Sequence, residues 1–522
     1  MEMQGKVKIS KKLVAINSAS SLIALGLNIL VLVWLQQYLL SRISTEEYSL
    51  LPVLYSIMMF TPLITVTLTS ALGRYTTAAY AEGDDLKVTR IVSTMTPILA
   101  AGGVLVAVLG TALSLNIDQV LTIAPQYVAE AKLMFLLLML FLALKLLMAP
   151  YVIGLEMTQR YLALNMVMTG GQFFRIGMIL TLLTGVSVKV LWIIVATVVA
   201  DTCVQLVLFL MSRRAVTALR FRFDIIDFSL ARQLLSFGGW STLTAIALSI
   251  RSSADAIILN KLGTPIGVTC YYLGALPLQY INRASSTALN PLNPVLIAMH
   301  TGGQNERLGR IFLKGGRWAL WFTLAVSVPL MVYSTEIMTL YVGDTYNTAG
   351  AVMLMILITY PLEQSVRMLF PLAEASANVR KLSLSLFAMS IFNLSLTLVL
   401  VGWFELDAIG SALGTAVSML VFYPLLLWPL ALKIAKVTWR SWITQTLIPG
   451  LIPAVVCSLF LVSVTLVIEL DDWLSLFAAC VGGGLVYVVT LIVFAMDHDE
   501  RADLRRLATT IMPRTKKLGE AN

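Results

Sequence analysis

Eight ionisable side chains lie within long apolar stretches of the sequence, where hydropathy alone would exclude them. They are Lys145, Arg175, Asp201, Arg251, Asp255, Arg283, Glu363 and Arg367. A charge near the centre of a bilayer costs about 2.5–3.5 kcal/mol on insertion scales, so a basic residue kept there needs an anion or a wet cavity. Five of the eight are basic and three are acidic. The remaining positive charge predicts an anionic ligand, because the planar fork of arginine suits phosphate and carboxylate oxygens.

Polar residues recur at helical spacing beside several of these charges, which indicates shared helix faces. The sets are Asn17, Ser21 and Asn28; Asn165, Thr169, Gln172 and Arg175; Ser241, Thr244, Arg251 and Asp255; and Gln279, Arg283, Ser286 and Asn290. Arg175 and Arg283 have no obvious local acid, so we expect both to face a cavity. For Asp201 and for the i,i+4 pair Arg251 and Asp255, mutual pairing inside a packed bundle is an equal alternative.

Other residues that could carry chemistry are few. Lys145 and Arg367 lie in the inner halves of their segments, from which both could also snorkel toward water. The histidines, His300 and His498, lie in polar segments, which excludes a histidine proton relay within the membrane. The cysteines are scattered through apolar stretches without metal-ligand spacing, so we interpret them as small core residues. They are Cys203, Cys270, Cys457 and Cys480.

The elements that must position these residues follow from the composition. Of 522 residues, 58% are hydrophobic and 12% are charged, about half the charge of a soluble domain. A hydrocarbon core of about 30 Å takes ~20 helical residues per crossing, and apolar runs of this length recur along the whole chain. We therefore predict an all-α polytopic membrane protein with about 14 transmembrane helices. They span 13–39, 48–72, 91–114, 130–152, 161–184, 187–211, 238–261, 266–297, 313–334, 347–372, 382–402, 406–432, 446–468 and 473–496.

Basic residues outside the apolar stretches indicate the orientation. With a cytoplasmic N-terminus, the inward segments hold 28 of the 37 lysines and arginines, and the outward segments hold three. This bias is typical of cytoplasmic loops and continues to the end of the chain, so both termini are predicted to be cytoplasmic. The net charge of +9 is then a topology signal, which disfavours nucleic-acid binding. Short outward loops without a phosphate-binding, dinucleotide or H-E-x-x-H motif disfavour a membrane-embedded enzyme.

The longest internal polar segment, 212–237, divides the chain and mixes five arginines with aromatic and aliphatic residues. We interpret it as a cytoplasmic linker that is partly an amphipathic interfacial helix, with lipid sensing as the alternative to a plain connector. LLSRISTEEYSLL (39–51) and ILNKLGTPIGVTC (258–270) look repeated on either side of it. Parallel repeats enclose a central cavity and favour alternating access. The predicted units are six-helix lobes at 1–211 and 238–440, two further helices in 441–497, and a basic cytoplasmic tail at 498–522.

Five stretches form a recognisable series along nearly the whole chain. TEEYSLLPVLYSI follows the first predicted helix, and ALGRYTTAAYAEGD closes the second. LLSFGGWSTLTAIALSIRSSADAIILNKLGTPIGVTCYYLGALPL opens the second half, and LYVGDTYNTAG and IGSALGTAVSML come later. Together they resemble the bacterial O-antigen and polysaccharide flippases of the multidrug/oligosaccharidyl-lipid/polysaccharide (MOP) exporter superfamily. Tyr48-Ser49 stands where Tyr/Phe-Gly is common, and Gly238-Gly239-Trp240 replaces the usual Gly-x-Pro, so subfamily placement rather than the fold is affected.

The resemblance implies a transporter, not an enzyme. It would move an undecaprenyl-pyrophosphate-linked oligosaccharide from the inner to the outer leaflet of the bacterial inner membrane, with the pyrophosphate and sugar in a basic cavity. Arg251 and Arg283 are then the first candidates for the headgroup contact, followed by Arg175, Lys145 and Arg367.

The same resemblance suggests supporting residues and partners. Asp255 is expected to position Arg251, Asp201 is the candidate for a coupling H⁺ or Na⁺, and Asn28 belongs to the supporting polar set. No cofactor or metal site is expected. Expected partners are the lipid-linked oligosaccharide and membrane lipids, with a polysaccharide polymerase and a chain-length regulator as further candidates and no nucleic acid. The alternatives are a multidrug or cation antiporter of the same superfamily, which would want acids and aromatics facing its cavity, and a membrane-embedded polymerase or ligase.

Overall fold

The computed structural model describes residues 26, 33–58, 62–158, 160–236, 239–289, 305–375, 379–498 and 500–502. Every regular element among these residues is a helix, and no strand occurs in them. The predicted all-α fold is therefore confirmed. The first predicted helix, 13–39, falls mostly outside the described residues, as does Asn28.

The first half of the chain forms a group of helices that we call the N-terminal lobe. Its elements are α2 (Thr45–Met58), α3 (Pro62–Ala81), α4 (Asp85–Leu115), α5 (Ile117–Val120), α6 (Val128–Val152), α7 (Gly154–Met157), α8 (Tyr161–Gly185) and α9 (Val190–Ala215). α4 begins where the Asp84 side chain accepts a hydrogen bond from the Lys87 N–H, which satisfies an amide that the first helical turn leaves free. α6 packs between α4 and α9, and α9 also packs along α8.

The second half forms the C-terminal lobe and a C-terminal hairpin. The lobe contains α11 (Gly239–Leu262), α12 (Pro265–Leu289), α14 (Asn305–Val332), α15 (Ser334–Val342), α16 (Thr348–Gln364), α17 (Leu369–Ala375), α18 (Val379–Gly402), α19 (Asp407–Phe422) and α20 (Trp428–Ala435). The hairpin follows with α21 (Trp439–Trp442), α22 (Ile448–Thr465) and α23 (Trp473–Thr490). α11 packs along α18 and α12 along α16, while α22 packs against both α14 and α23.

Nine of the described helical stretches are long and apolar enough to cross a membrane, or ten if the bent pair within α11 counts as one span. This confirms a polytopic membrane protein, while the count of 14 stays a prediction. One difference has a clear structural cause. The segment 347–372, predicted as one helix, is divided into α16 and α17 by a turn at 365–368, so α16 alone is 17 residues long and falls short of a full crossing.

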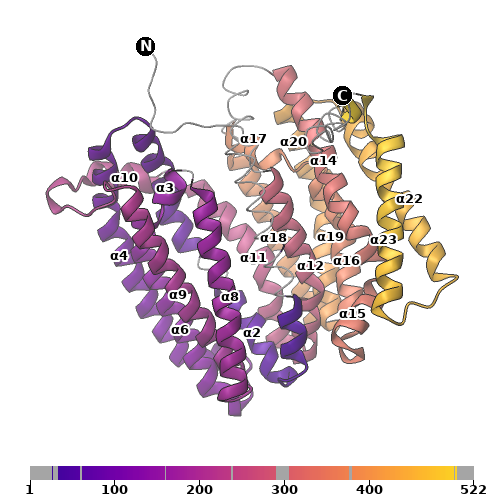
Figure 1. Ribbon diagram of the computed structural model, residues 1–522, viewed down its shortest axis with the longest axis horizontal. Helices are drawn as coiled ribbons and strands as arrows, with labels where there is room; N and C mark the ends of the chain where they lie inside the picture. Colours follow the sequence, from indigo (N-terminus) through magenta and orange to yellow (C-terminus); the bar gives the residue numbers. More distant parts are fainter. Residues whose placement is uncertain are drawn as a thin grey trace, which may run out of the picture.

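Four buried clusters show how the lobes meet. Figure 1 places α10 (Phe228–Ser236), α17 and α20 at one end of the bundle, which we call the linker end, and α15 toward the opposite, far end. One cluster, which includes Val92, belongs to the N-terminal lobe, and another, which includes Phe312, belongs to the C-terminal lobe. A third cluster combines both lobes, with Leu54 and Phe135 from the first and Leu357 from the second. Because it also takes residues from α5 and α15, the shared core lies toward the far end.

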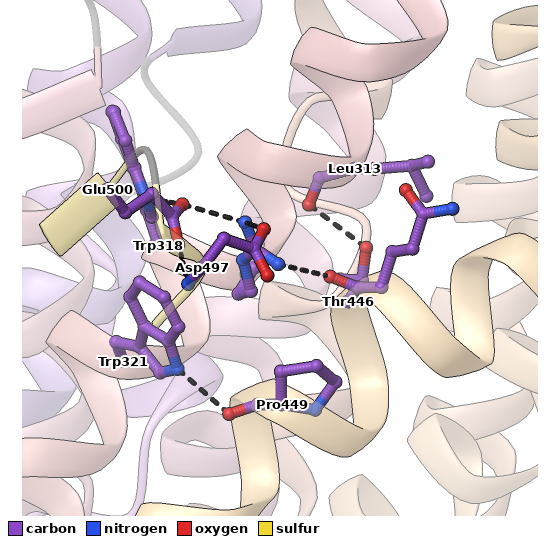
Figure 2. Close-up of polar contacts among 9 residues, drawn as sticks. Leu313, Trp318, Trp321, Thr446, Pro449, Asp497 and Glu500 are labelled. Carbon is purple, nitrogen blue, oxygen red and sulfur yellow. Dashed lines mark hydrogen bonds and ion pairs between the residues drawn. The ribbon is translucent and has the colours of Figure 1, made fainter. Parts of the chain in front are cut away.

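The fourth cluster fixes the C-terminal hairpin to the C-terminal lobe. Leu320 of α14 packs with Leu461 of α22 and Tyr487 of α23. Nearer the linker end, the Trp321 Nε1–H donates to the Pro449 carbonyl at 2.9 Å, and the Thr446 hydroxyl donates to the Leu313 carbonyl at 2.9 Å (Figure 2). The hairpin is thus bound to α14 by apolar packing and by hydrogen bonds that cross between helices.

The linker lies against the N-terminal lobe instead of hanging free. The hydroxyl of Thr89 in α4 donates to the Ala218 carbonyl at 2.9 Å, and the Ser93 hydroxyl accepts from the Arg222 N–H at 2.9 Å. The helix predicted here is α10, and its Leu234 is buried in the core of the N-terminal lobe. Ala231 and Leu234 of this helix are thus buried, while Phe228 at its start is 84% exposed. Hydrogen bonds from Ser229 and the Leu230 amide hold the pKa of Asp227, which precedes α10, below its usual value.

Candidate functional site

Two arginines and one carboxylate meet inside the C-terminal lobe. Nη2 of Arg251 in α11 lies 2.8 Å from Oε2 of Glu363, and Nη1 of Arg367 lies 3.6 Å from Oε1 of the same carboxylate. Arg367 also donates through Nη2 to the hydroxyl of Ser286 in α12. The Glu363 side chain is 6% exposed and each arginine side chain is 18% exposed. One deeply buried negative charge therefore serves two positive charges, and the cluster stays net positive.

The break between α16 and α17 positions two members of this cluster. Glu363 lies in the last turn of α16, and Arg367 lies in the turn that follows. Backbone hydrogen bonds in the break span three residues instead of four: the Val366 N–H donates to the Glu363 carbonyl, and the Arg367 N–H donates to the Gln364 carbonyl, each at 3.2 Å. This tighter path separates α16 from α17. In membrane proteins, broken helices are tolerated where they are buried in protein or line a cavity.

Two tryptophans hold the backbone of the break. The Trp428 Nε1–H donates to the Leu362 carbonyl at 3.1 Å, and the Trp442 Nε1–H donates to the Ser365 carbonyl at 3.3 Å. These carbonyls come at the point where helical hydrogen bonding stops, so the indoles supply hydrogen-bond partners from other helices. The Leu362 carbonyl also accepts from the Ser365 hydroxyl at 2.8 Å. Gly316 of α14 faces the same turn, and a Cβ there would lie 2.5 Å from the Ser365 carbonyl oxygen. Glycine at this position permits the close approach.

Asp255 belongs to a different pocket from Arg251. Its Oδ2 accepts a hydrogen bond from the Tyr271 hydroxyl at 2.6 Å, and its Oδ1 accepts one from Thr397 at 3.0 Å. Thr415 is a further hydrogen-bond partner. Asp255 makes no ion pair with Arg251, because Arg251 reaches α16, whereas Asp255 reaches α12 and α18. Tyr271, which bonds Asp255, also interacts electrostatically with Arg251, and the positioning of Arg251 by Asp255 stays a prediction.

The Asp255 pocket holds polar oxygens but has no cation in ion-pair contact among the described residues. Asn393 of α18 donates through Nδ2 to Thr415 at 3.3 Å, and its buried Oδ1 has no hydrogen-bond partner. Carboxylate, hydroxyl and amide oxygens are ligands for hard cations. In the described part of the chain no three His, Cys, Asp or Glu residues gather to hold a metal ion, so this pocket has one carboxylate and neutral oxygens.

A second cluster of two basic residues and one acid lies in the N-terminal lobe. Asp201 of α9 interacts electrostatically with Arg175 of α8 and Lys145 of α6. Arg175 donates through Nη2 to the side-chain amide oxygen Oε1 of Gln172, while its buried Nε has no hydrogen-bond partner. Lys145 is exposed. Asp201 therefore has two basic neighbours, so the charges do not cancel within this lobe either.

The two lobes approach each other at Tyr280 of α12. Its hydroxyl interacts electrostatically with both Arg283, on the same helix, and Arg175, on the opposite lobe. Arg283 is exposed. The two arginines predicted to face a cavity thus lie near one phenol, although they are far apart in the sequence. Glu363 was not among the predicted site residues, although its place in an apolar segment and its i,i+4 spacing from Arg367 could have indicated a role.

Cross-lobe hydrogen bonds lie at the far end. The Thr45 and Tyr346 hydroxyls are 2.7 Å apart, and the Tyr341 hydroxyl donates to the Val33 carbonyl at 2.6 Å. The Asn260 side chain accepts from the Thr122 N–H at 2.9 Å and donates to the Thr122 carbonyl at 3.0 Å. These contacts agree with the shared core at the same end.

No model of a known protein family matches the chain. The chain is similar to the uncharacterized membrane protein EpsK of Bacillus subtilis (strain 168), with 19% identity over an alignment of 503 residues that covers 93% of this chain and 96% of the relative. The structure is similar to the lipid II flippase MurJ in its inward closed conformation, with a TM-score of 0.66 and 15% identity over 94% of this chain and 100% of that chain. It is also similar to an inward-facing multidrug resistance MATE family transporter of the MOP superfamily, with a TM-score of 0.63 and 12% identity over 80% of this chain and 96% of that chain.

The chain has the MOP-superfamily fold. The functions named for these two structures are lipid II flipping and multidrug transport, neither of which is enzymatic. In this chain the Asp201 cluster lies in the N-terminal lobe, and the Glu363 cluster and the Asp255 pocket lie in the C-terminal lobe. The lobes share their core toward the far end.

Proposed function

We propose that the protein is a flippase for an undecaprenyl-pyrophosphate-linked oligosaccharide in surface polysaccharide assembly. The observation that carries this proposal is the surplus of positive charge in both lobes, where Asp201 and Glu363 each serve two basic residues. Arg283 adds a further positive charge near Arg175, at the approach of the two lobes. A pyrophosphate brings the negative charge that such a surplus lacks, and arginine binds it through paired hydrogen bonds.

The transport step in this proposal is alternating access. The shared core and the cross-lobe hydrogen bonds lie toward the far end, whereas each lobe has its own core toward the linker end. This supports a state that is closed at the far end. If the basic linker end is cytoplasmic, as the distribution of lysine and arginine predicts, this state faces inward. Moving the headgroup outward then requires the far-end contacts, such as that between Thr45 and Tyr346, to break.

The Asp255 pocket is the favoured place for a coupling ion. Its carboxylate has no arginine or lysine in contact, and its neighbours supply further oxygen ligands. Asp201 is less suited, because Arg175 and Lys145 already balance its charge. Binding of H⁺ or Na⁺ at Asp255 would neutralise the carboxylate and change how α11 packs on α18.

The proposal places the protein in the bacterial inner membrane with both termini in the cytoplasm. Its partners would be the lipid-linked oligosaccharide, membrane lipids, and a polysaccharide polymerase with its chain-length regulator. The alternative is a multidrug or cation antiporter, which the likeness to the MATE transporter supports. Charge separates the two: a cationic substrate would meet repulsion at Arg175, Arg283 and the Glu363 cluster.

The test combines lipid binding with export. Arg175→Gln and Arg283→Gln should each weaken binding of undecaprenyl diphosphate to the purified protein by about tenfold or more, since each removes charge-assisted hydrogen bonds. Export of surface polysaccharide should fall while the protein level stays normal. Exposed Arg440→Gln is the matched control, expected to match the parent in both assays. Unchanged binding and polymer in both cavity variants would refute the basic cavity, and selective binding of organic cations would favour the antiporter.

A further inference from the structure

Glu363 contacts both arginines of the Arg251–Glu363–Arg367 cluster. A carboxylate that only balanced the charge of one arginine would not need this arrangement. We propose that Glu363 is a positioning residue, which holds Arg251 and Arg367 as a paired receptor for the two phosphates of a lipid diphosphate. This inference rests on the proposed function and adds to it the residue that would make the site selective for a diphosphate over a monophosphate.

The two carboxylate oxygens of Glu363 are divided between the arginines. Oε2 serves Arg251 at 2.8 Å and Oε1 serves Arg367 at 3.6 Å. Because both oxygens belong to one planar group, the two guanidinium groups are fixed relative to each other. Tyr423 interacts electrostatically with both Arg251 and Glu363, and Ser286 binds Arg367 from α12. Each member of the pair is therefore oriented by more than one contact.

Burial and charge indicate which groups a ligand would meet. The carboxylate is the deepest of the three groups, and each arginine is three times as exposed as Glu363, at 18% against 6%. A guanidinium has five N–H donors, and Glu363 occupies only part of them on each arginine. The cluster carries two positive charges against one negative, so it attracts an anion. A diphosphate diester presents two phosphates with about one negative charge each, which matches two guanidinium groups better than a single phosphate does.

The local backbone supports a fixed geometry. Arg367 lies in a break of a membrane helix, where its position would be soft if the freed carbonyls were unsatisfied. Trp428 and Trp442 bind the carbonyls of Leu362 and Ser365 at this break. A helix that is broken and then firmly held is typical of substrate sites in transporters, where irregular backbone faces a ligand. A purely structural ion pair would need no break.

The experiment measures how well the purified protein distinguishes undecaprenyl diphosphate from undecaprenyl monophosphate. The parent protein should bind the diphosphate about tenfold more tightly, and Glu363→Gln should reduce this preference to about twofold or less. Glu363→Gln should also weaken diphosphate binding, although it makes the cluster more positive, because the arginines lose their shared orientation. Tighter diphosphate binding by Glu363→Gln, or an unchanged preference, would overturn the positioning role.

A double variant separates positioning from folding. Glu363→Gln alone leaves Arg251 without its anion and should lower Tm, whereas Glu363→Gln with Arg251→Met removes both charges and should recover Tm. We expect this double variant to lack the diphosphate preference even though it is folded. Recovery of both Tm and preference would make Glu363 merely structural. Arg367→Met, which leaves the 2.8 Å pair of Arg251 and Glu363 intact, should also lose the preference and serves if Glu363→Gln does not fold.

The proposed function and the positioning role fail in different ways. If the parent protein binds neither lipid, the flippase proposal falls and the role of Glu363 falls with it. If the parent binds and prefers the diphosphate but Glu363→Gln does so equally, only the positioning role falls. Arg283→Gln is expected to weaken binding of both lipids alike, because Arg283 lies outside the pair, and Arg440→Met is the exposed control.

Discussion

Two buried arginine–carboxylate clusters in the second half of the chain have opposite ratios of acids to arginines. At the linker end, Nη2 of Arg317 lies 2.8 Å from Oδ2 of Asp497 and 2.7 Å from Oε1 of Glu500 (Figure 2). There one arginine meets two acids. Within the bundle, Glu363 is one acid that meets two arginines, Arg251 and Arg367.

The Arg317 cluster connects separate helices, and its two acids outnumber its one arginine. Arg317 of α14 also donates through Nη1 to the Gln445 carbonyl at 3.2 Å, next to α22. Glu500, which follows α23, accepts from the Trp318 Nε1–H at 2.9 Å and from the Asp497 N–H at 3.1 Å. These contacts tie three separate parts of the chain together at one point. Arg317 is only 7% exposed, and the Glu500 side chain is 2% exposed.

We call the Arg317–Asp497–Glu500 cluster the clamp, because it joins parts of the chain, and the Arg251–Glu363–Arg367 cluster the receptor, because we propose that it binds a ligand. In the Arg317 cluster the protein itself supplies more anion than the arginine requires, so an outside anion has nothing to add. In the Glu363 cluster the protein supplies too little, and the basic side chains are the more exposed members. The ratio of acids to arginines, together with how exposed the arginines are, therefore indicates whether such a cluster stabilises the fold or binds a ligand: Arg317 is 7% exposed, whereas Arg251 and Arg367 are each 18% exposed.

The largest effect is expected from Arg317→Met. This change leaves Glu500 buried without a cation, and removing one partner of a buried pair costs about 3–5 kcal/mol. We expect a lower Tm in detergent and a reduced amount of protein in the membrane. Arg440→Met, on an exposed residue of α21, is the control and should leave Tm unchanged.

A companion variant decides whether charge is the cause. Arg317→Met with Glu500→Gln should regain part of the lost Tm, because no uncompensated buried carboxylate remains. In the folded fraction, binding of undecaprenyl diphosphate should be unchanged per molecule. If the folded double variant no longer binds undecaprenyl diphosphate, the Arg317 cluster contributes to ligand binding. The proposed contrast between a structural cluster and a binding cluster would then be wrong.

Hydropathy and charge spacing gave much of the fold in advance, because each helix is a local apolar run and loop charges report topology. α6, predicted at 130–152, runs Val128–Val152, and α8, predicted at 161–184, runs Tyr161–Gly185. The division into α16 and α17 was not predictable in this way. The run 347–372 is mostly apolar apart from the polar stretch Glu363–Arg367, and the contacts that hold the break come from Trp428, Trp442 and Gly316 on other helices.

The site was predictable by residue type but not by pairing. The charge surplus and the candidates Arg251 and Arg367 follow from composition and hydropathy. The sharing of Glu363 by the two arginines could not be predicted, since Glu363 is 112 residues from Arg251 in the sequence. The i,i+4 spacing suggested Asp255 as the partner of Arg251 instead. The partners of Arg317 were not predictable for the same reason: its acids lie 180 and 183 residues further on, and the residues meet only when the chain folds back.

A smaller effect should follow from removing an indole hydrogen bond at the helix break. Trp442→Phe keeps the aromatic packing but frees the Ser365 carbonyl, which should cost about 1–3 kcal/mol for a buried unsatisfied group. We expect a modest fall in Tm and a larger proportional loss of diphosphate preference, because Arg367 lies in the loosened turn. Trp321→Phe, which frees the Pro449 carbonyl next to the clamp instead, is the matched control for an equal loss of one indole bond. Equal losses of preference in both variants would show that the break has no special link to binding.

The smallest effect is expected from Asp497→Asn, which tests whether the clamp really holds an excess of acid. The Asp497 side chain is 65% exposed, so water screens its attraction for Arg317, and exposed ion pairs contribute about 1 kcal/mol or less. Glu500, which is buried and bonded to both Arg317 and Trp318, still balances the arginine after this change. Tm should therefore fall only slightly for Asp497→Asn and much further for Glu500→Gln. If the two variants lose the same Tm, both acids are needed, and the surplus that distinguishes this clamp from the Glu363 cluster does not exist.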